Sequence, residues 1–114
     1  MRAIFYAGRR VALAAGDWVK FSPHIELLET DHPLRRFVTA VCLWSCEVDT
    51  GRLPVGWDPL AAEVYARALL MPAELFEGLE RELPDHVIAE DLNVPLEQVA
   101  LRRADLAAER AAGG

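Results

Sequence analysis

Two cysteines, Cys42 and Cys46, have the residue type and spacing that best fit metal or redox chemistry in this chain. Because they are four residues apart, both thiols lie on the same face if the segment is helical. Thiolates bind zinc, and paired thiols take part in redox reactions. The competing interpretation is two buried free thiols, since free cysteine packs like a small hydrophobic residue. Two cysteines are too few for a disulfide framework.

The three histidines do not form a ligand set. His24, His32 and His86 fall in different predicted elements, and no two of them share a helix face at ligand spacing. We expect each at the surface, at a helix cap or at the edge of the core. The sequence also lacks the G-x-S-x-G motif of a nucleophilic serine and the glycine-rich motifs of nucleotide-binding loops.

The segment His86 to Arg103 has the pattern of a helix-turn-helix, with Asn93-Val94 as the tight turn. In a small DNA-binding regulator, the second helix would present Gln98, Arg102 and Arg103 to the bases. Acidic residues surround these arginines and oppose the approach of phosphates. The alternative is that both helices pack over the core with their apolar side chains inward.

Local patterns predict an α+β fold in a single domain over residues 1–114. Residues 1–22 are rich in strand-forming residues and predict a small antiparallel sheet of about three strands. The expected strands are Ala3–Tyr6, Arg10–Ala14 and Trp18–Phe21. Residues 30–110 predict about five helices, which begin after Thr30, at Pro59 and at Pro72 and then cover 85–92 and 95–110.

The first of these helices contains an uncharged run from Phe37 to Cys46. A helix without a polar face must be covered on both sides, so this run predicts a buried core helix. Thr30 is the expected N-cap, followed by Asp31 and Pro33, which suit the first turn.

The composition limits the partners. The net charge is −6, and the single lysine, Lys20, is accompanied by scattered arginines that we expect at solvated positions. This balance disfavours a free-standing nucleic-acid binder. No apolar stretch reaches the roughly 18 to 20 residues that cross a bilayer, and the apolar segment behind Arg2 is too short for a signal peptide. We therefore expect a cytoplasmic protein without membrane contact.

Three fragments, read in order, carry a resemblance to a known family. They are Arg36-Phe37-Val38-Thr39-Ala40, the segment Ala62 to Pro72 with its Leu69-Leu70-Met71-Pro72 ending, and the segment Ile88 to Arg102. Together they resemble the ImmA/IrrE (DUF955-like) family of zinc metallopeptidases, over about residues 34 to 106. In that family an R-F-x-x-A sequence enters an H-E-x-x-H helix behind a small sheet, and a later helix ends in L-L-M-P. The resemblance implies a zincin-type core helix.

Aligned on this pattern, the chain lacks the zinc site of the family. The two histidine positions fall on Val41 and Ser45, the general-base glutamate falls on Cys42, and the third ligand falls on Pro59. Valine and proline cannot bind zinc, and serine is a poor ligand. No group remains to lower the pKa of a bound water. The indole of Trp44 is expected to fill the space for substrate and metal, so the resemblance implies no catalytic residue and no cofactor.

A shift of one residue gives a competing arrangement. Cys42 and Cys46 then take the places of the two histidines, and Asp58 or Glu63 supplies a carboxylate from the next helix. Such a set can hold zinc in a structural role. The residue after Cys42 is Leu43, so a general base would still be missing. An atypical metal-dependent peptidase therefore stays an alternative beside the DNA-binding regulator.

The resemblance also implies a setting. Members of the family cleave or bind a transcriptional repressor, often in phage or mobile-element circuits. A member without zinc ligands can keep the binding surface and lose the cleavage. We therefore expect a regulatory pseudo-peptidase that binds a protein partner, either a repressor or a second copy of this chain. The groove between the core helix and residues 51–57 is the expected contact surface.

Overall fold

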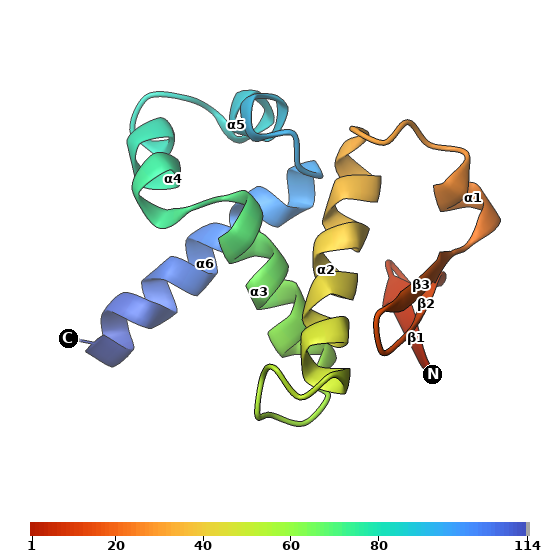
Figure 1. The fold of residues 1–114 in the computed structure, drawn as a ribbon. Coiled ribbons are helices and arrows are strands. Elements are labelled where there is room, and N and C mark those ends of the chain that lie inside the picture. Colours follow the sequence, from red (N-terminus) through yellow and green to blue (C-terminus); the bar gives the residue numbers. More distant parts are fainter. Residues whose placement is uncertain (114) are drawn as a thin grey trace.

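The N-terminal residues form a three-stranded antiparallel sheet in the order β1-β2-β3, as the sequence predicted. The computed structural model describes residues 1–113 and is drawn in Figure 1. The strands are β1 (Arg2–Tyr6), β2 (Arg9–Ala15) and β3 (Trp18–Phe21). Two-residue turns join them, because Tyr6 pairs with Arg9 and Ala15 pairs with Trp18.

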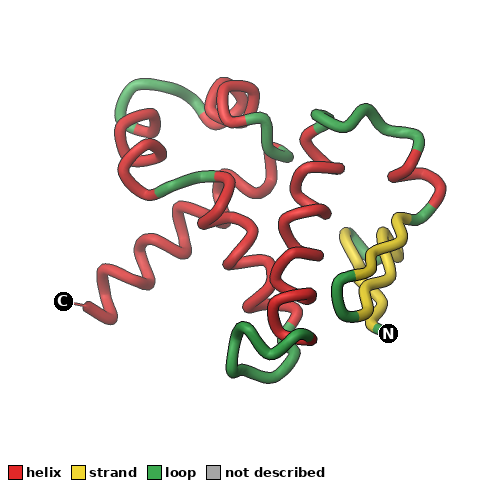
Figure 2. The backbone as a smooth tube through the Cα atoms, viewed as in Figure 1, coloured by secondary structure: helices red, strands yellow, loops and turns green. Residues whose placement is uncertain are grey.

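Six helices follow the sheet, which confirms the α+β fold class. The sequence did not predict α1 (Pro23–Glu26), a single helical turn that follows the sheet directly. The five predicted helices are α2 (Pro33–Asp49), α3 (Pro59–Leu70), α4 (Ala73–Glu80), α5 (Asp85–Leu92) and α6 (Leu96–Gly113). Figure 2 distinguishes these helices from the loops between them. Within residues 1–113, no helix has both the length and the hydrophobicity to cross a membrane.

Helix α2 begins later than predicted. The expected N-cap, Thr30, lies outside the helix, and His32 is the N-cap instead. Its Nδ1 accepts a hydrogen bond of 3.1 Å from the backbone N–H of Leu34. The residue before a proline avoids helical backbone angles, so Pro33 at the first helical position places the boundary at His32.

The uncharged run in α2 is buried as predicted, except along one stripe. Its buried residues are Phe37, Val38, Ala40, Val41, Cys42, Trp44, Ser45 and Cys46. Leu43 is 46% exposed, and Thr39, one turn earlier, is also exposed. The sheet packs on one side of α2 and α3 on another, as Figure 1 shows. Neither element covers the stripe of Thr39 and Leu43, so the prediction of complete coverage is wrong there.

The apolar side chains form two separate clusters. The first lies between the sheet, α1, α2 and α3 and includes Ile25, Phe37 and Ala66. The second begins at Met71 and fills the space between α4, α5 and α6. Leu70, at the end of α3, packs against both clusters. In Figure 2 the helices α4 to α6 and the sheet lie on opposite sides of α2 and α3.

The turn between β1 and β2 generates a first prediction. Ala7 and Gly8 have φ angles of 52° and 77°, the combination that a type I′ turn requires. Alanine is strained there because its Cβ approaches the following carbonyl oxygen, whereas asparagine is favoured in this conformation. We predict that Ala7→Asn raises the free energy of unfolding by about 0.5–1 kcal/mol in urea denaturation.

Ala100→Asn, on the exposed side of α6, is the matched control. It should lower the stability slightly, because asparagine is a poorer helix former than alanine. An unchanged or lower unfolding midpoint for Ala7→Asn would contradict the assignment of strain to this turn.

Candidate functional site

A hollow of about 260 Å³ brings together positions that the resemblance assigned to the lost zinc site. Val41 of α2 and Pro59 of α3 both line it, and Glu63, one turn after Pro59, lines it as well. Its other walls are Trp57 and residues 3–5 of β1. Trp57 is the one residue of the segment 51–57 that lines the hollow, and three wall residues come from β1, so the hollow overlaps the predicted groove only at Trp57.

This hollow contains one group that could bind a metal, the carboxylate of Glu63. That carboxylate lies 3.9 Å from the guanidinium of Arg67. Ser45, at the second histidine position, is fully buried, and its hydroxyl donates a hydrogen bond of 3.3 Å to the carbonyl of Val41. A catalytic zinc ion needs three protein ligands, so one carboxylate does not make a zinc site. The hollow is chemically an apolar pocket with one negative side chain.

Trp44 does not fill the hollow, which corrects the prediction. Its indole packs against Trp57, with ring centroids 5.4 Å apart and ring planes at 52°. The guanidinium of Arg2 lies 5.2 Å from the centroid of the Trp57 ring and also donates a hydrogen bond of 3.0 Å to Asp49. Trp44 and Arg2 therefore hold Trp57 in place as a wall and leave the hollow open.

The two cysteines lie on a different side of α2, next to β3. Cys42 and Cys46 line a second hollow of about 240 Å³ together with Val19 and Phe21, and both thiols are free. Burial, with a smaller effect of Cys46, raises the pKa of the Cys42 thiol to about 12. Burial and the negative charge of Asp17 raise the pKa of Cys46 as well. Both thiols are thus protonated at neutral pH, whereas zinc binding and thiol exchange require the thiolate.

The carboxylates considered as further ligands are not beside these thiols. Glu63 lines the first hollow, and Asp58 is the N-cap of α3, where its Oδ1 accepts a hydrogen bond of 3.0 Å from Leu60. In the described part of the chain, no group of three or more His, Cys, Asp or Glu residues is placed to hold a metal ion. The structure thus does not bring Cys42 and Cys46 together with Asp58 or Glu63, because the two thiols line the hollow beside β3 and Glu63 lines the hollow around Val41.

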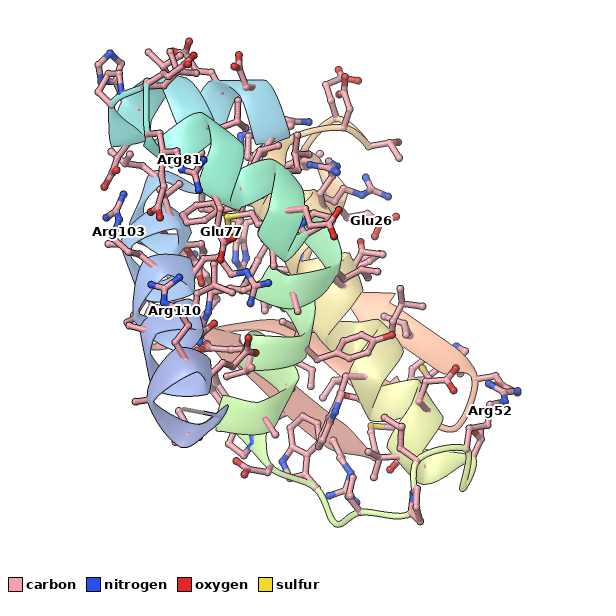
Figure 3. All side chains as sticks on the ribbon, turned by 90° about the vertical axis from the view of Figure 1, so that its left-hand side faces the viewer. Glu26, Arg52, Glu77, Arg81, Arg103 and Arg110 are labelled. Carbon is pink, nitrogen blue, oxygen red and sulfur yellow. The ribbon has the colours of Figure 1, made fainter. Side chains whose placement is uncertain are left out.

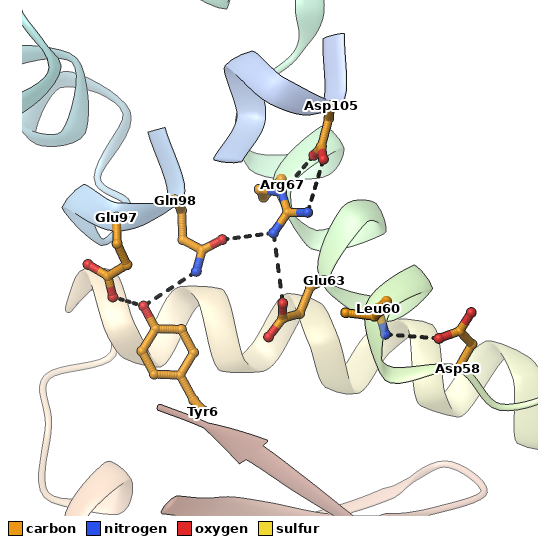
Figure 4. A network of polar contacts seen from close by, with 8 residues as sticks. All are labelled: Tyr6, Asp58, Leu60, Glu63, Arg67, Glu97, Gln98 and Asp105. Carbon is orange, nitrogen blue, oxygen red and sulfur yellow. Dashed lines mark hydrogen bonds and ion pairs between the residues drawn. The ribbon is translucent and has the colours of Figure 1, made fainter. Parts of the chain in front are cut away.

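A buried polar network connects α3, α6 and β1, as Figure 4 shows. The guanidinium of Arg67, 6% exposed, donates hydrogen bonds of 2.6 Å and 3.0 Å to Asp105 and one of 3.1 Å to Gln98. The amide of Gln98 donates to the hydroxyl of Tyr6 at 3.5 Å, and this hydroxyl also bonds to Glu97. A bidentate arginine–carboxylate pair is directional, so it fixes how the two helices lie against each other.

The sequence prediction missed this network because it placed the arginines at solvated positions. The pattern of α6 does contain a signal. Gln98, Arg102 and Asp105 recur at helical spacing on the same side as Val99 and Leu106, which are buried. Polar residues on the apolar side of a helix are expected to have buried partners. The identity of those partners depends on the tertiary fold.

The tail does not offer the DNA-reading surface that the helix-turn-helix pattern predicted. Gln98 and Arg102 are each only 3% exposed. The Nε of Arg102 donates a hydrogen bond of 2.9 Å to the carbonyl of Met71 at the end of α3. Arg103 lies farther out, where Glu80 and Asp85 pair with it. The prediction is wrong for Gln98 and Arg102 because this side of α6 packs against α3.

Ion pairs hold the outer side of α6 to its neighbours, and Figure 3 shows Arg103 and Arg110 along this helix. Arg110 pairs with Glu77 of α4 at 3.2 Å. The hydrogen bond from Arg103 holds the pKa of Asp85 below its usual value and raises the pKa of Arg103 itself. These pairs are solvent-accessible and contribute little to stability. They do neutralise arginines that would otherwise attract phosphates.

Comparison with known proteins assigns no family. No family model, no curated protein and no solved structure matches the chain. The basis for a function is therefore the geometry of the hollow around Val41 and of its surroundings.

The buried ion pair generates a second prediction. Arg67→Met should lower the free energy of unfolding by about 3–5 kcal/mol, because it leaves the mostly buried Asp105 without its partner. Arg67→Met combined with Asp105→Leu should regain most of this loss, since no unpaired charge stays buried. Urea denaturation measures both effects.

Arg52→Met is the control for the loss of an arginine. Arg52 pairs with Asp17 and Glu47 on the surface, so its removal should cost less than about 1 kcal/mol. Equal losses for Arg52→Met and Arg67→Met would show that the buried network contributes no more than a surface pair.

The raised pKa of Cys42 generates a third prediction. The folded pKa of about 12 lies above the ordinary value of 9.0, so the contribution of this thiol to stability is fully present below about pH 9. Above that pH the unfolded chain loses the proton first. The free energy of unfolding should then fall by up to about 1.4 kcal/mol per pH unit for this group.

Cys42→Ala should show a shallower decline than the unmodified protein between pH 8.5 and about 10.5 in urea denaturation at each pH. All other side chains are the same in both proteins, so the difference between the two slopes reports Cys42. Identical slopes would mean that the folded state leaves this thiol free to ionise.

Proposed function

We propose that this protein is a catalytically inactive relative of the ImmA/IrrE metallopeptidases that acts in the cytoplasm by binding a protein partner. The hollow around Val41 is the proposed binding site, and a transcriptional repressor is the partner that the resemblance implies. The observation that carries this proposal is the lining of the hollow. Val41 and Pro59, the positions that the resemblance assigns to zinc ligands, both line an open pocket with a mostly apolar surface.

The dimensions of the hollow suit part of a protein partner. A volume of about 260 Å³ accommodates a large apolar side chain but is below the usual range for small-molecule sites. Burying an apolar side chain there would favour binding by about 1.5–3 kcal/mol. The fixed Trp57 wall means that little ordering would oppose this gain.

One wall residue of the hollow, and two residues close in sequence to wall residues, are apolar and exposed. Phe5, which lines it, is 60% exposed. Leu60, next to Pro59, and Val55, two residues before Trp57, are 72% and 55% exposed. Grouped exposed apolar side chains mark protein interaction sites more often than isolated ones do. Glu63 adds a negative charge, so a partner with a basic residue beside an apolar one fits this surface best.

The same surroundings support a role without hydrolysis. Peptide-bond cleavage by this class of enzyme needs a metal-bound water and a general base. Glu63 is the one acidic side chain that lines the hollow, and its carboxylate lies 3.9 Å from the guanidinium of Arg67, so this pocket offers neither a second metal ligand nor a separate general base. Binding without cleavage is the function that these residues support.

Site-specific crosslinking tests the proposal. A photoreactive phenylalanine analogue at position 5 in the full-length chain, expressed in its native host, should crosslink one predominant protein. We expect this protein to be a DNA-binding repressor and to stay intact. The same analogue at Leu75, an exposed position on α4, is the matched control and should not capture that protein.

Charge reversal completes this test. Glu63→Lys should weaken the crosslink at position 5 at least several-fold, because it repels the basic residue expected on the partner. Equal capture from positions 5 and 75 would contradict the assignment of the hollow. Cleavage of the captured protein that a chelator abolishes would contradict the loss of catalysis.

A further inference from the structure

The sheet has an open edge at β3, on the side away from β1 and the hollow around Val41. The turn between β2 and β3 has two residues, so Ala15 and Trp18 form a hydrogen-bonded pair. The hydrogen bond from the N–H of Ser22 to the carbonyl of Val11 shows that the pair Val11–Ser22, at the other end of the ladder, is also hydrogen-bonded. Because such pairs alternate, the N–H and C=O groups of Val19 and Phe21 point away from β2.

These four backbone groups have the spacing of a strand and no partner. Within residues 1–113, no hydrogen bond from outside the β2–β3 ladder reaches the backbone of Val19 or Phe21. Native sheets normally protect such an edge with a covering element, a bulge or charge. On β3 itself, the one charged residue that could protect the edge is Lys20, the single lysine of the chain.

No helix or loop covers this edge in the described part of the chain, and two hollows lie beside it. The larger one, about 790 Å³, is lined by all four residues of β3 together with residues of α1 and Arg35. The smaller one, about 240 Å³, is lined by Val19 and Phe21 together with Leu43 and other residues of α2. Trp18, Leu27 and Leu43 are 49%, 87% and 46% exposed around these hollows. The uncovered stripe of α2 is thus part of the same surface.

We propose that the β3 edge binds an extended segment of a partner protein as a fourth strand, with an acidic residue between two apolar residues. The apolar residues pair with Val19 and Phe21, so their side chains face the smaller hollow. The acidic residue lies opposite Lys20. Lys20 and Arg35 line the larger hollow against one acidic residue, Glu26, so the side of the edge that faces the acidic residue is positively charged. The smaller hollow is lined by Asp17, Glu47 and Arg52, and it receives the apolar side chains.

A second copy of the chain fits this edge less well. Two β3 strands related by a two-fold axis use all four outward groups only when Val19 pairs with Phe21 of the other copy. That register places Lys20 directly opposite Lys20 of the second copy. Like charges in this position are destabilising, whereas a carboxylate there is attractive. The register therefore favours a different, acidic partner strand.

Nuclear magnetic resonance of the full-length chain tests the proposal with a defined probe, the peptide acetyl-Thr-Val-Glu-Val-Thr-amide. The amides of Val19 and Phe21 should shift and exchange more slowly with solvent. The amides of Trp18 and Lys20 already pair with β2, so their exchange should stay unchanged. The same peptide with N-methyl groups on both valines cannot form the strand bonds and should not bind.

Two variants make the test specific. Lys20→Glu should change the preference between the Val-Glu-Val and Val-Lys-Val peptides by about two- to fivefold in favour of lysine. Val19→Pro should abolish binding while the sheet persists, since the lost N–H is outside the β2–β3 ladder. Lys20→Glu keeps every backbone hydrogen-bonding group. If Val19→Pro unfolds, the changed peptide preference of Lys20→Glu therefore still tests the proposed strand pairing.

Three results would overturn the proposal. The first is no change at Val19 and Phe21 up to the solubility limit of the Val-Glu-Val peptide. The second is binding that survives N-methylation, which would indicate an apolar surface without strand pairing. The third is a dimer in sedimentation that Val19→Pro abolishes, which would assign the edge to a second copy. None of these readouts involves the hollow around Val41, so this test is independent of the crosslinking experiment.

Discussion

The guanidinium of Arg67 connects two parts of the chain that bury separate sets of apolar side chains. Burying a charge is costly unless hydrogen bonds and an opposite charge offset the loss of water. Asp105 and Gln98 supply both from α6, and the hydroxyl of Tyr6 extends the network to β1. Apart from Leu70, few apolar side chains belong to both clusters. The position of α6 relative to the sheet therefore depends on this polar contact.

The same guanidinium influences the hollow around Val41. Glu63 lines the pocket and also forms an ion pair with Arg67, so the one negative charge of the pocket is linked to the buried network. A partner that binds in the pocket meets a carboxylate whose charge is already partly balanced. This arrangement suits a modest electrostatic preference added to an apolar contact, which is the balance found in protein interfaces.

Local sequence patterns predicted the three strands and five of the six helices, because alternation, capping residues and prolines act over a few neighbouring residues. They missed α1, a single turn, and misplaced the start of α2, where Pro33 overrides a good capping residue at Thr30. For the candidate site, the resemblance grouped Val41 with Pro59, and both line one hollow. The direction of Trp44, the separation of Cys42 from Glu63 and the burial of Arg102 depend on how distant helices pack. No spacing within one helix encodes those contacts.

The polar network joins segments that are synthesised at different times. The network joins Tyr6, near the first residue, to Gln98 and Asp105 of the last helix. During synthesis the ribosome releases the N-terminal part of the chain first. Tyr6 of β1 and Arg67 of α3 thus leave the ribosome before their polar partners in α6 exist. Until α6 has been synthesised, Arg67 lacks the carboxylate and the amide that offset the cost of burying its charge, so this part of the interior can close only after α6 arrives.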